Sequence, residues 1–142
     1  MLEVVTCRAL AGWFALALLV SAPARAQRAP GWDVRVVERV EVAAGATGVL
    51  TISVAVDRGL TVSKDAAVII DLAPDPGIAV KKKRLGRSDA VDPEADAPRF
   101  AVSVRGDTPG DHPIRLRVRF WLCGGKSCRP IDVRRTATIA VI

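Results

Sequence analysis

The chain has 142 residues, of which 50% are hydrophobic, and it carries a formal net charge of +6 at pH 7. That length suffices for one domain, or for one domain preceded by a targeting segment, and it excludes large nucleotide-fold and barrel enzymes, which need more residues. Three cysteines are an awkward number for a protein held by disulfides, so their positions decide what they can do.

Residues 1–26 have the pattern of a secretory signal peptide. Arg8 precedes an apolar run over residues 9–20, and the segment ends in the small-residue triplet Ala24-Arg25-Ala26. The apolar run would rise only about 18 Å as a helix, against roughly 30 Å for a hydrocarbon core. We therefore expect cleavage near Ala26, a periplasmic or secreted location, and no stable membrane span in the mature chain. An uncleaved anchor is the alternative.

Cleavage simplifies the cysteine count. Cys7 leaves with the leader, and the mature chain keeps one pair, Cys123 and Cys128. An exported protein meets an oxidising compartment, in which such a pair can persist as a disulfide.

β-branched residues dominate the chain after residue 26. Residues 27–142 contain 25 valines and isoleucines against six leucines, and this bias favours strands because branched side chains suit a pleated surface. Apolar and polar residues alternate around 50–56, 100–104 and 114–122, which is typical of half-buried antiparallel strands. In chain order, the pattern predicts strands near 33–43, 48–57, 67–73, 78–82, 99–105, 113–122 and 132–141.

Turn residues separate these segments, as in Pro74-Asp75-Pro76-Gly77 and between Gly106 and Pro113. About seven short strands without a convincing helix predict one antiparallel, immunoglobulin-like β-sandwich over residues 27–142. Residues 84–98 are polar and rich in aspartate and proline, so we expect a loop there. No internal repeat or second domain is visible.

The stretch FWLCGGKSCRP, residues 120–130, is the most informative part of the chain. The alternating strand runs into Cys123, four residues separate it from Cys128, and Gly124-Gly125 lets the backbone turn back sharply. We expect the two cysteines to form a disulfide that closes a hairpin loop at one end of the sandwich.

The residues alone leave three interpretations of this pair open. A short disulfide beside Lys126 and Arg129 suits thiol–disulfide exchange, because positive neighbours favour the thiolate. The bond is equally compatible with a stabilising staple, which for a six-residue loop contributes about 2 kcal/mol in the chain-entropy model. Metal binding is the weakest, because the mature chain adds only His112, which we expect to be a solvated turn residue. We expect no cofactor and no metal.

The motif Phe120-x-x-Cys123-x4-Cys128-x-Pro130, at the end of a sandwich strand in an exported domain, resembles the N-terminal periplasmic domain of the DsbD thiol:disulfide interchange proteins. Residues 59–63 and Gly110 also sit where that family has similar residues. The resemblance implies an immunoglobulin-like fold in which Cys123 and Cys128 are the redox pair. The family shields its pair with an aromatic-bearing cap loop, which we do not assign here.

The resemblance also implies a partner and an activity. The module would relay electrons by thiol–disulfide exchange to or from a periplasmic thioredoxin-like protein or a membrane electron carrier, as a thiol:disulfide oxidoreductase. The alternative is a non-enzymatic binding or assembly module whose disulfide pins a hairpin.

Two further segments of the sequence are rich in basic residues. Residues 81–84 are expected to be a solvated strand end. The arginines at 115, 117 and 119 face away from the core and are expected to pair with acidic residues on a neighbouring strand, as a candidate docking surface. Export argues against nucleic acid as a partner.

Overall fold

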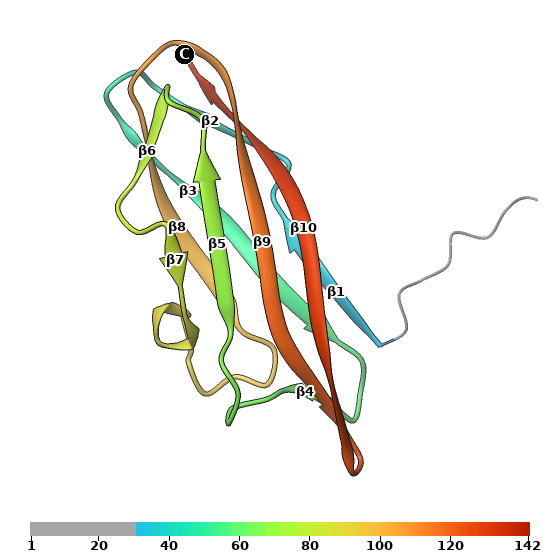
Figure 1. The fold of residues 1–142 in the computed structure, drawn as a ribbon. Helices are drawn as coiled ribbons and strands as arrows, with labels where there is room; N and C mark the ends of the chain where they lie inside the picture. Colours follow the sequence, from blue (N-terminus) through green and yellow to red (C-terminus); the bar gives the residue numbers. More distant parts are fainter. Residues whose placement is uncertain (1–30) are drawn as a thin grey trace, which may run out of the picture.

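The computed structural model describes residues 31–142, and the predicted signal peptide lies outside them. The described residues form two β-sheets packed face to face, with a single short 3₁₀ turn as the helical element (Figure 1). The predicted all-β, immunoglobulin-like sandwich is confirmed.

The first sheet is antiparallel throughout, with the strand order β1-β3-β8-β6. The second sheet has the order β2-β10-β9-β5-β7, and β4 pairs with the far end of β9. In the second sheet β2 runs parallel to β10, and the other pairs are antiparallel. The strands are β1 (Trp32–Val36), β2 (Arg39–Val42), β3 (Thr47–Val56), β4 (Leu60–Val62), β5 (Ile69–Pro74), β6 (Ile78–Val80), β7 (Arg84–Leu85), β8 (Arg99–Gly106), β9 (Gly110–Gly124) and β10 (Ser127–Val141).

The core lies between the sheets and follows the alternation seen in the sequence. β9 buries every second residue, so that Ile114, Leu116, Val118, Phe120 and Leu122 face the first sheet. β3 and β8 bury their alternate residues in the same way. Each such aliphatic or aromatic side chain contributes about 1.5–3 kcal/mol by leaving water. This core fixes the register of β9, and with it the face on which the intervening residues lie.

The first predicted strand, 33–43, is two strands in the structure. The chain leaves the first sheet after Val36 and joins the second sheet at Arg39. The amide of Val37 still donates to the carbonyl of Thr51 in the first sheet, whereas the carbonyl of Glu38 accepts from Thr138 in the second. The alternation of apolar residues is interrupted at Val37, Glu38 and Arg39, which are exposed, and the chain changes sheets at this point.

The last two strands are longer than predicted. β9 and β10 have 15 residues each and are paired along their whole length, from Val141 opposite Gly110 to Ser127 opposite Gly124. Together they form a hairpin whose tip projects beyond the rest of the sandwich, at the end opposite the C-terminus (Figure 1).

Residues 84–98 are not the plain loop that their composition predicts. They begin with β7 and continue into the 3₁₀ turn η1 (Arg87–Asp89). Leu85, Ala90 and Pro98 are buried. The segment is thus packed onto the sandwich, in spite of its polar residues.

Candidate functional site

A tight turn brings the two cysteines together. Gly125 and Lys126 are the two central residues of the β9–β10 turn, with φ of 59° at Gly125 and a negative φ at Lys126. This combination fits a type II′ turn, whose first central position favours glycine. Cys123 and Cys128 are then direct cross-strand partners.

The predicted disulfide is present between them, and their Cα atoms lie 4.1 Å apart. That separation is near the roughly 4.5 Å of a non-hydrogen-bonded antiparallel pair, in which side chains are closest. The hairpin prediction is therefore confirmed, and the pairing of the strands alone is enough to place the two sulfur atoms within bonding reach.

The disulfide lies on the outer face of the second sheet. Cys123 is half-buried and Cys128 is exposed. Because side chains two residues apart share a face, Trp121 on β9 and its partner Pro130 on β10 lie next to the bond on that face. Cys128 is the more exposed of the two cysteines.

The neighbours of Cys128 in sequence are placed differently from what the sequence predicted. Arg129 is the partner of Leu122, whose side chain is buried on the opposite face of the sheet. Strand alternation thus directs Arg129 away from the disulfide face. Lys126 occupies the turn itself and is exposed. Of the two cations expected beside Cys128, Arg129 therefore points to the opposite face of the sheet, and Lys126 lies in the turn at the tip of the hairpin.

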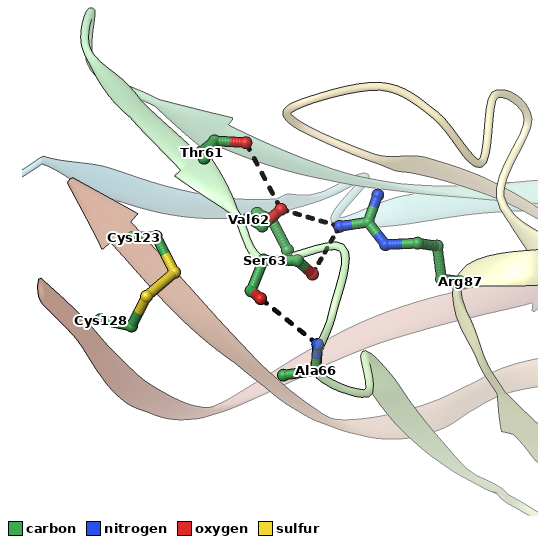
Figure 2. Close-up of a disulfide and its surroundings, with 7 residues drawn as sticks. All are labelled: Thr61, Val62, Ser63, Ala66, Arg87, Cys123 and Cys128. Carbon is green, nitrogen blue, oxygen red and sulfur yellow. Dashed lines mark hydrogen bonds between the residues drawn. A yellow bond between two sulfur atoms is a disulfide. The ribbon is translucent and has the colours of Figure 1, made fainter. Parts of the chain in front are cut away.

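Strand β4 lies alongside the cysteine-bearing end of β9. Thr61 is the partner of Cys123, and the amide of Ser63 donates to the carbonyl of Trp121 at 2.8 Å. Figure 2 shows β4 and Ser63 beside the disulfide, with the Ser63 hydroxyl accepting from the amide of Ala66 at 3.3 Å. The short strand β4 thus flanks Cys123, with the polar Thr61 as its direct partner.

Leu60 fixes β4 against the hairpin tip. A Cβ placed on Gly124 would lie 2.3 Å from one terminal methyl of Leu60, and a Cβ on Gly31 would lie 2.4 Å from the other. Leu60 therefore needs glycine on both sides. Leu60, Leu122, Gly124, Ser127 and Arg129 also line a shallow hollow of about 280 Å³ on the inner side of the tip.

Arg87 ties the segment 84–98 to β4. Its two terminal nitrogens donate to the carbonyls of Pro93 and Ala95 within the segment, and to those of Val62 and Ser63, at 2.9 to 3.1 Å. Figure 2 shows the guanidinium reaching the backbone of β4 from the side away from the disulfide. No role was assigned to Arg87 from the sequence, because its four main-chain acceptors lie elsewhere in the chain.

Asp96 adds a second link between the same two segments. Its carboxylate accepts from the Thr61 hydroxyl at 3.1 Å and lies 3.7 Å from the ammonium of Lys64. Its main-chain carbonyl accepts from the amide of Val62 at 2.9 Å. The polar segment 84–98 thereby holds the strand that flanks Cys123.

His112 lies at the other end of β9 and has a structural environment. Its Nδ1 is 2.6 Å from the Asp75 carboxylate and its Nε2 is 2.6 Å from the Thr108 carbonyl, with 12% of the side chain exposed. Both acceptors favour the protonated ring, and the hydrogen bond to Asp75 is the main reason that the pKa of His112 is raised above 6.5. His112, which we expected to be a solvated turn residue, is therefore largely buried and hydrogen-bonded to two other turns through Asp75 and Thr108. Within residues 31–142, no three His, Cys, Asp or Glu side chains are grouped as a metal site.

The fold and the site define an immunoglobulin-like β-sandwich with an exposed disulfide at the tip of its last hairpin. No family model matches the chain, and no curated protein matches it. Across the part of the chain that the structure describes, no helix has the length and apolar character that a membrane crossing requires.

The solved structures that are similar to the chain include two from Escherichia coli. One is AggA, the major subunit of aggregative adherence fimbriae type I from Escherichia coli, with 10% identity and a TM-score of 0.41 over 78% of this chain and 94% of that one. The other is trypsin-activated alpha-2-macroglobulin from Escherichia coli, with 12% identity and a TM-score of 0.47 over 78% of this chain and 7% of that one. Neither similarity bears on function, and the sandwich stands on the strand pairing given above.

Proposed function

We propose that the protein is an exported thiol–disulfide exchange module, related in its working to the N-terminal periplasmic domain of the DsbD proteins. Cys123 and Cys128 would relay electrons to or from a periplasmic thioredoxin-like partner or a membrane electron carrier. The observation that carries the proposal is the position of the disulfide. It is exposed at Cys128, and it joins two residues that an unbroken strand ladder already pairs.

Because β9 and β10 are already paired by backbone hydrogen bonds, the disulfide adds little to the stability of the hairpin. A six-residue loop is worth about 2 kcal/mol in the chain-entropy model, whereas a loop of about a hundred residues is worth nearly 5 kcal/mol. An immunoglobulin-type structural disulfide joins the two sheets, while this one lies within a single hairpin. A bond with this small a structural role is free to open and close without unfolding the domain.

The exposure of the two sulfurs suggests the order of the exchange. A partner thiolate attacks Sγ of Cys128, the Sγ–Sγ bond breaks, and its electron pair stays on Sγ of Cys123. A second thiolate of the partner then attacks the partner's own sulfur in the mixed disulfide and releases the Cys128 thiolate. Two electrons have passed to this protein, the partner is oxidised, and the reverse sequence passes them on.

The reduction potential of the purified protein tests the proposal. We expect a potential less reducing than about −300 mV and equilibration with a thioredoxin-like protein, because structural disulfides in secreted proteins are usually more reducing than that value. The variant Cys123→Ser should trap a mixed disulfide through Cys128, and Cys128→Ser should trap much less. A more reducing potential without exchange would leave the hairpin staple of a binding or assembly module.

A further inference from the structure

The outer face of the second sheet carries an unusual concentration of arginine. The alternate residues of β9 that point away from the core are Arg115, Arg117 and Arg119, followed by Trp121 and Cys123. β10 places Arg134 on the same face, opposite Arg117, and β7 places Arg84 there, opposite Asp71 of β5. We call these five arginines, with Trp121 and Pro130, the arginine face.

Acidic neighbours neutralise only part of this face. Arg117 forms a two-pronged ion pair with Asp132, at 2.6 and 3.0 Å. Arg84 and Arg119 share the carboxylate of Asp71, each at 2.7 Å. The expected pairing of the ladder with a neighbouring strand is thus observed at positions 117 and 119.

Among residues 31–142, no carboxylate lies within ion-pair distance of Arg115 or Arg134, although the charge of Arg134 helps to lower the pKa of Asp132. Both arginines are exposed. Five arginines against two aspartates leave a net charge of +3 on the face. A guanidinium without a carboxylate partner on a strand surface is ready to bind one, because its planar fork matches a carboxylate in two hydrogen bonds.

The face is also hollowed in two places along β9. One hollow, of about 370 Å³, is lined by Ala73, Arg115, Arg117 and Arg134 among others. The second, of about 300 Å³, lies beside Trp121 and Pro130 and reaches Ile69 on the neighbouring strand β5 and Ala67 just before it. Trp121 is 43% exposed. Arg115, Arg117 and Arg134 bring guanidinium groups to the first hollow, next to Asp71. Trp121 brings an aromatic side chain to the second, next to Arg119 and Asp132.

The spacing of the two hollows sets the size of a ligand. Trp121 lies six positions after Arg115 on β9, which corresponds to about 20 Å along the strand. An extended peptide of about seven residues covers that distance. A second copy of this chain is a poor occupant, because two faces of charge +3 repel each other.

We propose that the arginine face binds an extended acidic segment of a partner protein, with carboxylates at Arg115 and Arg134 and one apolar side chain against Trp121. This docking surface adjoins the disulfide but does not depend on its redox activity. It would serve equally a module in which the disulfide is only structural.

Binding of a synthetic peptide tests this proposal. The probe is a peptide of about seven residues with one phenylalanine at an end and glutamate elsewhere, and its comparison peptide has lysine in place of glutamate. Titration of the purified protein should shift the fluorescence of Trp121 with the acidic peptide only, and the affinity should fall as salt is raised. The variant Trp121→Phe should remove most of the fluorescence change.

Charge reversal locates the binding site. Arg115→Glu and Arg134→Glu should each weaken the acidic peptide by about tenfold or more, because each replaces an attraction by a repulsion. Arg99→Glu, which makes the same change of net charge at an exposed position of β8 in the other sheet, should change the affinity by less than about twofold. Equal effects at positions 99 and 115, equal binding of the lysine peptide, or no binding of the acidic peptide would each overturn the proposal.

Discussion

Removal of the disulfide should leave the sandwich folded. The double variant Cys123→Ser/Cys128→Ser takes away a bond between two residues that the β9–β10 ladder pairs in any case. The loss has an upper bound of about 2 kcal/mol, the chain-entropy value for a loop of six residues. For a domain of this size, that corresponds to a fall in Tm of about 8 °C.

Urea unfolding provides the measurement. Trp32 packs edge-on against Phe120, with ring centroids 6.0 Å apart, and so its fluorescence reports the state of the core. We expect the oxidised protein, the reduced protein and the double serine variant to unfold cooperatively with similar slopes, and the last two to agree in midpoint. Reduced protein is the matched control, because it breaks the bond without changing a side chain.

A loss of more than about 4 kcal/mol would refute the reasoning, as would a reduced protein that is unfolded at 25 °C. Either result would mean that the bond holds the architecture together. The exchange function would then lose its main support, since each turnover would unfold the domain.

Three further predictions concern the surroundings of the two ends of β9. The stability that His112 contributes through Asp75 should be complete below pH 6.5 and should be lost as the pH rises through the raised pKa of the folded state, so that urea midpoints fall as the pH is raised above 6.5. Arg87→Met should cost on the order of 3 kcal/mol and speed hydrogen exchange of the Val62 amide, because four main-chain carbonyls lose a charged donor. Gly124→Ala should cost about 1–3 kcal/mol in urea unfolding, because the new methyl group meets Leu60.

Each of these predictions has a control. His112→Gln should flatten this decline, and an unchanged decline would assign it to another group. Arg99→Met removes an exposed arginine from a strand end and should leave stability within about 0.5 kcal/mol. Adding Leu60→Ala to Gly124→Ala should recover part of the loss, and strictly additive effects would mean that the two residues do not collide.

The sequence predicted most of the architecture because the core obeys one simple rule. Alternation identified β3, β8 and β9, whose buried residues all contact the opposite sheet. The short strands β4 and β7 carry too few residues for any period to be visible. The division of 33–43 into β1 and β2 was missed for a different reason, since the switch of sheets depends on which neighbour each half finds in the folded chain.

The disulfide of the candidate site could be predicted from the sequence, but the contacts of the residues around it could not. The spacing of Cys123 and Cys128, with two glycines between them, was enough to predict the hairpin and the bond. The contacts of Arg87 and Asp96 with β4 and Ser63 join residues that are 24 to 35 positions apart in the chain, so no local sequence pattern predicts them. The orientation of Arg129 was misjudged because sequence proximity was read as spatial proximity, and neighbours on a strand point to opposite faces.

Among the strand pairings of residues 31–142, the hairpin that carries the cysteines joins the residues that are nearest in sequence. Its turn joins residues that are adjacent in the chain, whereas the pairings of β3 with β8 and of β5 with β9 close much longer loops. Closing a loop of this length takes on the order of 10–100 ns in an unfolded chain, and contacts between distant segments form later. The sulfur atoms can therefore meet before the sandwich exists. The oxidation state of the pair can be set while the polypeptide is still unfolded, and it can be reset afterwards at the exposed tip.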